Sequence, residues 1–108
     1  MSKISYEDFK KMDMRVVQVV KAESIPGRSK IIRLVLDIGG GETRTVIAGG
    51  AQFYSLEDFL AKKFVAIVNL MPKTVAGVTS DGMLLATDTE KPLWLSVDSS
   101  APVGSKII

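Results

Sequence analysis

Two segments of this 108-residue sequence carry basic side chains with no acid between them. Between Glu23 and Asp37 every charged residue is basic, and the same holds between Asp58 and Asp81. Together the segments hold six of the 14 Lys and Arg residues, namely Arg28, Lys30, Arg33, Lys62, Lys63 and Lys73. If the fold gathers such cations on one side, they form a surface that attracts polyanions. A solvated surface with chance spacing explains the pattern equally well at this point.

Histidine and cysteine are both absent, which limits the available chemistry more than any residue present. Catalytic triads, histidine proton shuttles and zinc sites with His or Cys ligands all need these side chains. The 12 Asp and Glu residues show no clustering of the kind that hard cations use. We therefore expect a binding protein rather than an enzyme, with no metal and no other cofactor.

The composition favours one folded domain over residues 1–108, because 46% of the residues are apolar and a chain of this length has room for one core. No apolar run approaches the ~20 residues of a membrane span. The N-terminus, MSKISYEDFKK, lacks the apolar centre of a signal peptide. We expect a soluble, cytoplasmic chain, and the start at Met1 favours a free-standing protein.

Five segments rich in valine, isoleucine and leucine predict β-strands. They span residues 15–23, 31–38, 43–48, 64–69 and a last segment from 82 or 83 to 86 or 87. In the second of them, alternate residues form one apolar face that we expect to be buried: Ile32, Leu34, Leu36 and Ile38.

Two Ser-x-x-Asp capping boxes predict short helices. Ser5 and Asp8 begin one that ends near Met12, and Ser55 begins another that runs to about Lys62. Three strands, a helix and two strands follow the order of an OB-fold, a five-stranded Greek-key barrel. The expected fold class is therefore all-β, with short helices at the N-terminus and between strands three and four.

In an OB-fold the second and third strands bind ligands together with the loop between strands one and two and the loop between strands four and five. In this sequence those loops are residues 24–30 and residues 70–81. Each of the two acid-free segments supplies one of them. The predicted fold thus favours a functional basic face over chance spacing.

Several motifs follow one another in the order and spacing of a known family. They include Asp13-Met14-Arg15-Val16, Lys30-Ile31-Ile32-Arg33-Leu34, Asn69-Leu70-Met71-Pro72-Lys73 and Ser80-Asp81-Gly82-Met83-Leu84-Leu85-Ala86. Through them the chain resembles the tRNA-binding domain of methionyl-tRNA synthetase C-termini, phenylalanyl-tRNA synthetase β chains, stand-alone dimeric tRNA-binding proteins and the endothelial monocyte-activating cytokine. The resemblance covers essentially the whole chain.

This resemblance implies binding of folded tRNA by its shape, with little regard to base sequence. It implies a homodimer, acting alone or as an accessory to an aminoacyl-tRNA synthetase, with the methionyl enzyme foremost. Whether the chain is free-standing, part of a synthetase or a partner that docks onto one stays open.

The resemblance also assigns roles to single residues. It implies phosphate contacts from Lys30 and Arg33, with Lys73 as a third cation across the groove. It implies a hydroxyl donor at Ser80 and an apolar contact to a base or ribose at Met83. The expected RNA-binding set is completed by Asn69, which either orders its loop or reaches RNA, and by Arg28, which is included for its charge and loop position.

Structural roles compete with some of these assignments. Met83 lies in an apolar strand and fits a core position as well as an RNA contact. Asp13 and Arg15 favour a half-buried polar pair near the helix end, and Lys62 and Lys63 fit the C-terminal dipole of the second helix. These last four residues are therefore not expected at the RNA site.

The sequence departs from the common family pattern at three places, which are Ser29, Gly50 and the pair Lys73-Thr74. The single cation in that pair weakens the expected affinity for RNA. This leaves an alternative open, a CsaA-type chaperone or dimerisation module of the same fold that binds unfolded polypeptide. The terminal Ile107-Ile108 is expected to pack against the barrel or against a second subunit.

Overall fold

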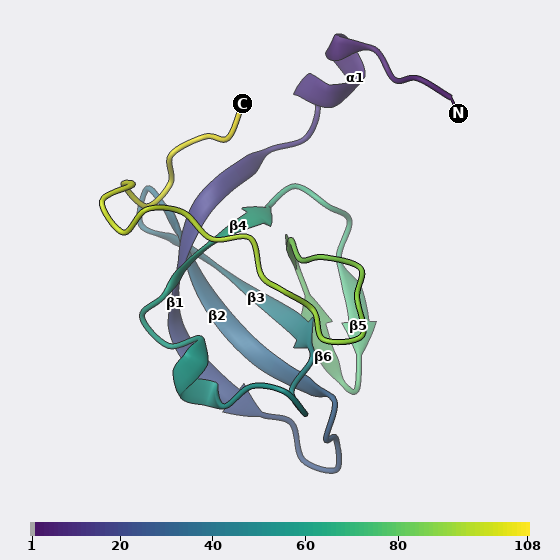
Figure 1. Ribbon diagram of the computed structural model, residues 1–108, viewed down its shortest axis with the longest axis vertical. Coiled ribbons are helices and arrows are strands. Elements are labelled where there is room, and N and C mark those ends of the chain that lie inside the picture. The colour runs from purple at the N-terminus through teal and green to yellow at the C-terminus, as the bar shows by residue number, and fades with distance from the viewer. Residues whose placement is uncertain (1) are drawn as a thin grey trace.

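The computed structural model describes residues 2–108, and these form a curled antiparallel sheet with strand order β3-β2-β1-β4-β7 (Figure 1). The strands are β1 (Met14–Ser24), β2 (Ile31–Gly39), β3 (Glu42–Gly49), β4 (Lys63–Ile67) and β7 (Met83–Leu84). The sheet closes onto β3, where the Asp81 N–H donates to the Thr45 carbonyl oxygen at 2.7 Å. This almost closed barrel confirms the predicted OB-fold.

Strand β1 pairs with two different strands along its length. Its first half, from Met14 to Gln18, pairs with β4, and its second half, from Gln18 to Ser24, pairs with β2. The register with β2 shifts between Val19 and Lys21. A bulge of this kind bends and twists a strand, as a small barrel requires.

The core lies inside this barrel, and β2 shows how the sequence builds it. Its predicted apolar face is buried, whereas the residues between are only half-buried. The face consists of Ile32, Leu34, Leu36 and Ile38, which belong to one apolar cluster with residues of β1, β3 and β4. Phe59 is fully buried in the same cluster, beside the short helix that leads into β4.

The helices are shorter than predicted. Helix α1 (Tyr6–Lys10) begins as expected, with Ser5 Oγ accepting from the Asp8 N–H at 3.0 Å, but the Asp8 carboxylate contacts Lys11 Nζ at 3.0 Å. The second helix is a single 3₁₀ turn, η1 (Leu56–Asp58), and the positive φ of Ala61, 64°, excludes helical backbone up to the predicted end near Lys62. Within residues 2–108 no helix is long and apolar enough to cross a membrane.

The predicted loop of residues 70–81 is wrong in one respect, because most of it is a β-hairpin. Strands β5 (Lys73–Val75) and β6 (Val78–Ser80) pair around a two-residue turn. Ala76 and Gly77 both have positive φ, 52° and 77°, as in the type I′ turns that tight hairpins favour. The flanking strands are correspondingly shorter than predicted, since β4 ends at Ile67 and β7 at Leu84.

The C-terminal segment continues the sheet beside β1. The Gly104 N–H donates to the Val16 carbonyl oxygen at 2.8 Å, and the Val16 N–H donates to the Ser105 carbonyl oxygen at 2.9 Å. The Ile107 N–H then donates to the Met14 carbonyl oxygen at 2.8 Å. Ile107 is half-buried and bonded to β1, so it lies against its own barrel as expected. Ile108 is 99% exposed within the chain.

Candidate nucleic-acid interface

A groove of about 410 Å³ lies between the outer face of β2 and β3 and the connection from β4 to β7. Its apolar lining consists of Ile31, Ile47, Leu70, Met71, Val75 and Met83. Lys73, Ser80 and Gly82 complete it. The predicted residues Lys73, Ser80 and Met83 therefore meet at one place, and the structure adds five apolar neighbours that the sequence analysis did not select.

Met83 is 44% exposed, whereas the next residue, Leu84, is 7% exposed and belongs to the core cluster. Strand alternation turns these two side chains to opposite faces of β7. The core role that competed for Met83 is therefore excluded, and its side chain is available at the groove. Its contact with RNA stays a prediction.

Ser80 holds the hairpin against the barrel. Its Oγ accepts from the Ile47 N–H at 3.0 Å and lies 3.4 Å from the Gly82 carbonyl oxygen, to which it donates. Gly82 is required beside it, because its φ is +143° and a Cβ there would lie 3.0 Å from the Ile67 carbonyl oxygen. Ser80 thus has a positioning role, and its predicted contact with RNA would come in addition.

Asn69 braces the start of the same connection. Its Oδ1 accepts from the Asp13 N–H at 2.8 Å, and its Nδ2 donates to the Lys11 carbonyl oxygen at 2.7 Å. Of the two roles left open by the sequence, the loop-ordering one therefore has direct structural support. The brace fixes where the exposed segment Leu70-Met71 leaves β4.

Arg28 and Lys30 line a second, smaller cavity of about 200 Å³, formed by residues 27–31 and called the loop pocket below. Ile31 lines both the loop pocket and the groove, so the two cavities adjoin. The predicted cations of the first loop and Lys73 of the hairpin are thereby brought to one side of the barrel. Within residues 2–108, no acidic residue lines either cavity.

Arg33 lies on the outer face of β2, opposite Ile47 in the register with β3. Its Nη1 is 3.7 Å from Glu23 Oε1, on the neighbouring strand. This separation makes an ion pair but is too long for a hydrogen bond. Part of the charge of Arg33 is therefore offset by Glu23, unlike the charges of the loop pocket.

Lys62 and Lys63 lie away from the groove, as their exclusion from the expected site requires. Both line a different cavity of about 610 Å³, together with Gln18 and Asp58. Lys63 Nζ donates to the carbonyl oxygens of Ser99 and Ala101, each at 2.7 Å. The six cations of the two acid-free segments thus do not share one face, and Lys63 anchors the C-terminal segment.

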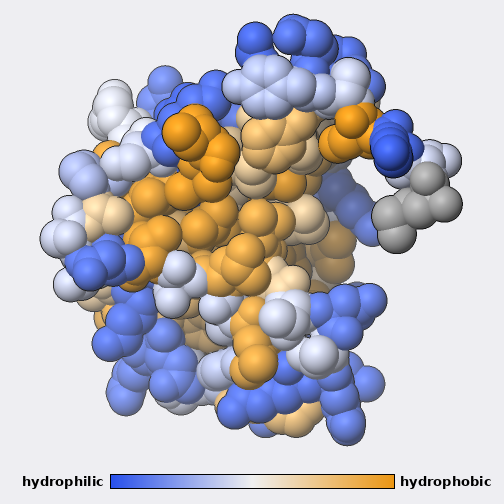
Figure 2. Space-filling view, turned by 45° about the horizontal axis from the view of Figure 1, so that its top comes forward, coloured by the Kyte–Doolittle hydropathy of each residue, from blue (hydrophilic) through white to orange (hydrophobic). Residues whose placement is uncertain are grey.

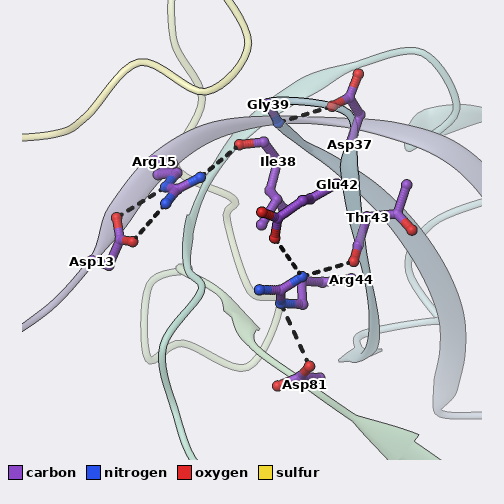
Figure 3. Close-up of polar contacts among 9 residues, drawn as sticks. All are labelled: Asp13, Arg15, Asp37, Ile38, Gly39, Glu42, Thr43, Arg44 and Asp81. Carbon is purple, nitrogen blue, oxygen red and sulfur yellow. Dashed lines mark hydrogen bonds and ion pairs between the residues drawn. The ribbon is translucent and has the colours of Figure 1, made fainter.

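A polar network lies at the far end of β2 (Figure 3). Arg15 contacts the Asp13 carboxylate at 2.8 and 3.0 Å and donates to the Ile38 carbonyl oxygen at 3.2 Å. The pair is about one-third exposed, at 32% and 28%, which confirms the predicted half-buried structural pair. The hydrogen bonds from Arg15 hold the pKa of the Asp13 carboxyl below its ordinary value of 3.8.

A second set of polar contacts lies nearby around Arg44, which joins β3 to the hairpin connection and was not selected from the sequence. Arg44 donates to the Thr43 carbonyl oxygen at 3.0 Å and lies 3.3 Å from Glu42 and 3.5 Å from Asp81 (Figure 3). Glu42 and Asp81 thereby neutralise it. The alternation of Glu42, Thr43 and Arg44 gave no sign of this pairing, because Asp81 comes from a distant segment.

Comparison with protein families gives a match to the model described as "Putative tRNA binding domain", over residues 14–106. Among curated proteins, the chain is 44% identical over 100 residues to methionine–tRNA ligase of Protochlamydia amoebophila, covering 92% of this chain. It spans only 14% of the length of that ligase and 16% of the length of the Methanococcus aeolicus enzyme.

Two solved structures resemble the chain along nearly its whole length. A MetRS related protein from Pyrococcus horikoshii is 38% identical with a TM-score of 0.93, and the match covers 100% of both chains. The chaperone CsaA from Bacillus anthracis is 32% identical with a TM-score of 0.88, and the match covers 99% of this chain and 100% of the other. The same barrel fold therefore occurs in proteins described by two different functions.

Proposed function

This chain belongs to the tRNA-binding domain family, and on that premise we propose that it binds folded tRNA without catalysing a reaction. One observation carries the proposal. The groove and the adjoining loop pocket together present Arg28, Lys30 and Lys73, and their lining in the described chain holds no acid. Such a surface complements a phosphate backbone.

Recognition by shape follows from what these cavities offer. Among the described residues neither lining contains an aromatic side chain, whereas proteins that bind extended single strands stack bases on aromatic platforms. Lysine and arginine contacts to phosphates position a folded RNA but carry little base information. The proposed ligand is therefore structured RNA, recognised through its backbone and 2′-hydroxyl groups.

The proposed contacts differ in strength. Lys30, Arg28 and Lys73 act as the main phosphate ligands, because none of them has an ion-pair partner among residues 2–108. Arg33 contributes less, since Glu23 lies beside it. Ser80 and Asn69 position the hairpin, and Met83 contributes apolar contact.

The chain's proposed place in the cell follows from its relatives. Methionine–tRNA ligases contain a similar sequence as a small part of their length, so the proposed role is that of a tRNA-holding accessory to an aminoacyl-tRNA synthetase, with methionyl enzymes foremost. This role belongs to the cytoplasm. It requires either covalent attachment to the synthetase or docking onto it.

The test is a titration of mixed tRNA labelled for fluorescence anisotropy, at several salt concentrations. For roughly four neutralised phosphates the slope of log K against log salt should be about −3 to −4. Competition with tRNAs of different sequence should shift the curves equally. Absence of detectable tRNA binding at low salt would reject the proposal.

A second candidate function has its own observation. The groove exposes apolar side chains, with Met71 91% and Leu70 40% exposed, and a similar structure is that of the chaperone CsaA. Binding of unfolded polypeptide uses such surfaces. A reduced, carboxymethylated polypeptide that binds in high salt, where tRNA is released, would favour this candidate.

The proposal includes a homodimer that uses the surface beside α1. Apolar side chains gather there on the face shown in Figure 2, and a cavity of about 250 Å³ lies between α1 and the C-terminal segment. Its lining includes Tyr6, which is 69% exposed, and Ile108.

Sedimentation equilibrium tests the dimer and should give twice the mass of one chain. Ile108→Asp should lower the measured mass. A monomeric mass of the unchanged protein at micromolar concentration would reject the dimer.

A further inference from the structure

The groove is more apolar than phosphate binding requires. Leu70, Met71 and Met83 all line it, and each is at least 40% exposed. Among the large apolar side chains of the described chain, Met71 is one of the most exposed, at 91%. Exposed apolar side chains that share one hollow mark a binding surface more often than single exposed residues do. Phosphate contacts with Lys73 leave these side chains without a role.

The hydroxyl group that lines the groove is already occupied. The Ser80 hydroxyl is hydrogen-bonded to Ile47 and Gly82, as described above. Within residues 2–108, no other side chain in the lining carries a hydroxyl, amide or carboxylate. Apart from Lys73, the side chains of the lining therefore offer a ligand mainly contact with carbon and sulfur.

The rim of the groove has the opposite character. Lys73 lines the groove itself, and Lys30 and Arg28 line the loop pocket that adjoins it at Ile31. An occupant must therefore combine an apolar body with negative charge. A nucleotide meets both requirements, because its base has two apolar faces and its phosphates are anionic.

The volume of the groove limits the occupant to a single unit. At about 410 Å³ it lies near the lower end of the roughly 300–1,000 Å³ range of small-molecule sites. The lining described above has no aromatic rings among residues 2–108, which disfavours a run of stacked bases. Methionine sulfur contacts ring faces and edges favourably whatever the base.

We propose that the groove between Met71 and Met83 takes one unstacked nucleobase of a folded RNA, while Lys73 and the loop pocket hold the neighbouring phosphates. This inference rests on the proposed tRNA binding and specifies it. The side chain of Met71 closes over the base from the β4–β5 connection, whose origin Asn69 fixes. The site thus distinguishes a nucleotide outside the helical stack from one within a duplex.

The experiment uses three RNA hairpins of one stem sequence. The first is fully paired, the second carries a single bulged nucleotide and the third carries an abasic residue at the bulge. The bulged RNA should bind the full chain about tenfold more tightly than the abasic RNA, as two sulfur–aromatic contacts of typical strength would give. Changing the bulged base among A, C, G and U should alter the affinity little.

Variants assign the preference to the groove. Met71→Ala and Met83→Ala should each reduce the tenfold preference for the bulged over the abasic RNA to about threefold or less. Met71→Leu, which keeps an apolar body, should retain most of it. Leu60→Ala is the matched control, because Leu60 is also exposed, at 47%, but does not line the groove.

Three outcomes would overturn the inference. If bulged and abasic RNAs bind equally while tRNA still binds, phosphate contacts alone hold RNA and no base enters the groove. If the methionine variants weaken binding of an unfolded polypeptide but leave the base preference unchanged, the groove belongs to polypeptide. If tRNA itself does not bind, the proposed function fails, a result distinct from the first.

Discussion

Strand β2 begins at the groove and ends at the polar network, and charged side chains have different surroundings at these two ends. Near Ile31, the cations of the loop pocket lie in a lining that, within residues 2–108, includes no acid. Near Ile38, Arg15 is held by Asp13 and by a backbone carbonyl. Arg44, farther along the same end, contacts two carboxylates. Cations at the network end are thus used within the protein, and those at the groove end are available to a ligand.

Apolar side chains follow the same division. Ile38 is buried in the core beneath the network, whereas Met71 and Met83 are exposed at the groove. Exposing apolar groups costs roughly 25 cal/mol per Å² of surface. The groove end thus gives up stability for binding capacity. Substitutions at the network end should therefore change mainly stability, and those at the groove end mainly binding.

The largest effect is expected at the network end, at Gly39. A Cβ on this residue would lie 2.7 Å from the Gly104 Cα, and its φ is +92°. Gly39→Asn should lower the free energy of unfolding by about 2–3 kcal/mol through this backbone clash, measured by urea denaturation. tRNA affinity of the folded protein should stay unchanged.

Gly40→Asn is the matched control for this change. Gly40 also has a positive φ, +65°, but nothing lies within 4 Å of the position that a Cβ would take there, and asparagine tolerates this region. Its cost should be below about 1 kcal/mol. Equal losses for both variants would show that the approach of Gly104 to the β2–β3 turn is unimportant.

The next effect is expected at the groove end. The double variant Lys30→Ala and Lys73→Ala should weaken tRNA binding about 30-fold at low salt and make the salt slope shallower by roughly 2, since two phosphate contacts are lost. Its free energy of unfolding should change by less than about 0.5 kcal/mol. Lys62→Ala, at an exposed cation outside the groove, is the control and should leave affinity unchanged.

A smaller effect concerns Asp13. The folded-state pKa of its carboxyl lies below the ordinary value of 3.8, because Arg15 donates hydrogen bonds to it. The Asp13–Arg15 pair therefore stabilises the protein fully above pH 3.8. This stabilisation is lost as the pH falls through the folded-state pKa. Asp13→Asn should cost about 1 kcal/mol at neutral pH. Denaturation curves measured below pH 3.8 should show a smaller difference in the free energy of unfolding between Asp13→Asn and the wild type. A difference that stays constant with pH would contradict a stabilising contact between Asp13 and Arg15.

The smallest effect is expected at Glu23, whose removal would free a further cation at the groove end. Glu23 is the acid that approaches a cation of the expected RNA site, with 3.7 Å between its Oε1 and Arg33 Nη1. Glu23→Gln should raise tRNA affinity about two- to threefold by releasing Arg33, as expected for a partly exposed pair. Binding isotherms at low salt measure this change, and reduced affinity would mean that Glu23 orients Arg33 for RNA.

The strands and their order were predictable because β2 alternates strictly and the valine-rich β1 is distinctive. The two-residue turn at Ala76 was missed, because an Ala-Gly pair is a weak hairpin signal beside Asn-Gly or Asp-Gly. The second helix was predicted too long because capping residues specify where a helix begins. Its end depended on the reversal at Ala61, which no propensity rule anticipates.

Charge pattern and resemblance brought Lys30, Lys73 and Met83 to attention, and the structure places all three at adjoining cavities. The remaining lining was not predictable, since Ile47 reaches the groove only through strand pairing. The sequence did contain a signal for Met71 that was not used. Met71 is an apolar residue in a loop that Asn69 was expected to order, and an apolar side chain held in such a loop stays outside the core. Contacts between distant segments, such as Arg44 with Asp81, leave no trace in sequence spacing.

The pairing of residues 104–107 with β1 joins segments that lie at opposite ends of the barrel sequence. Contacts so distant in sequence form late and slow a folding reaction. On the ribosome, the edge of β1 from Met14 to Val16 stays open until residues 104–107 have been synthesised. Loss of residues 104–108 would leave this edge uncovered, and open strand edges promote aggregation.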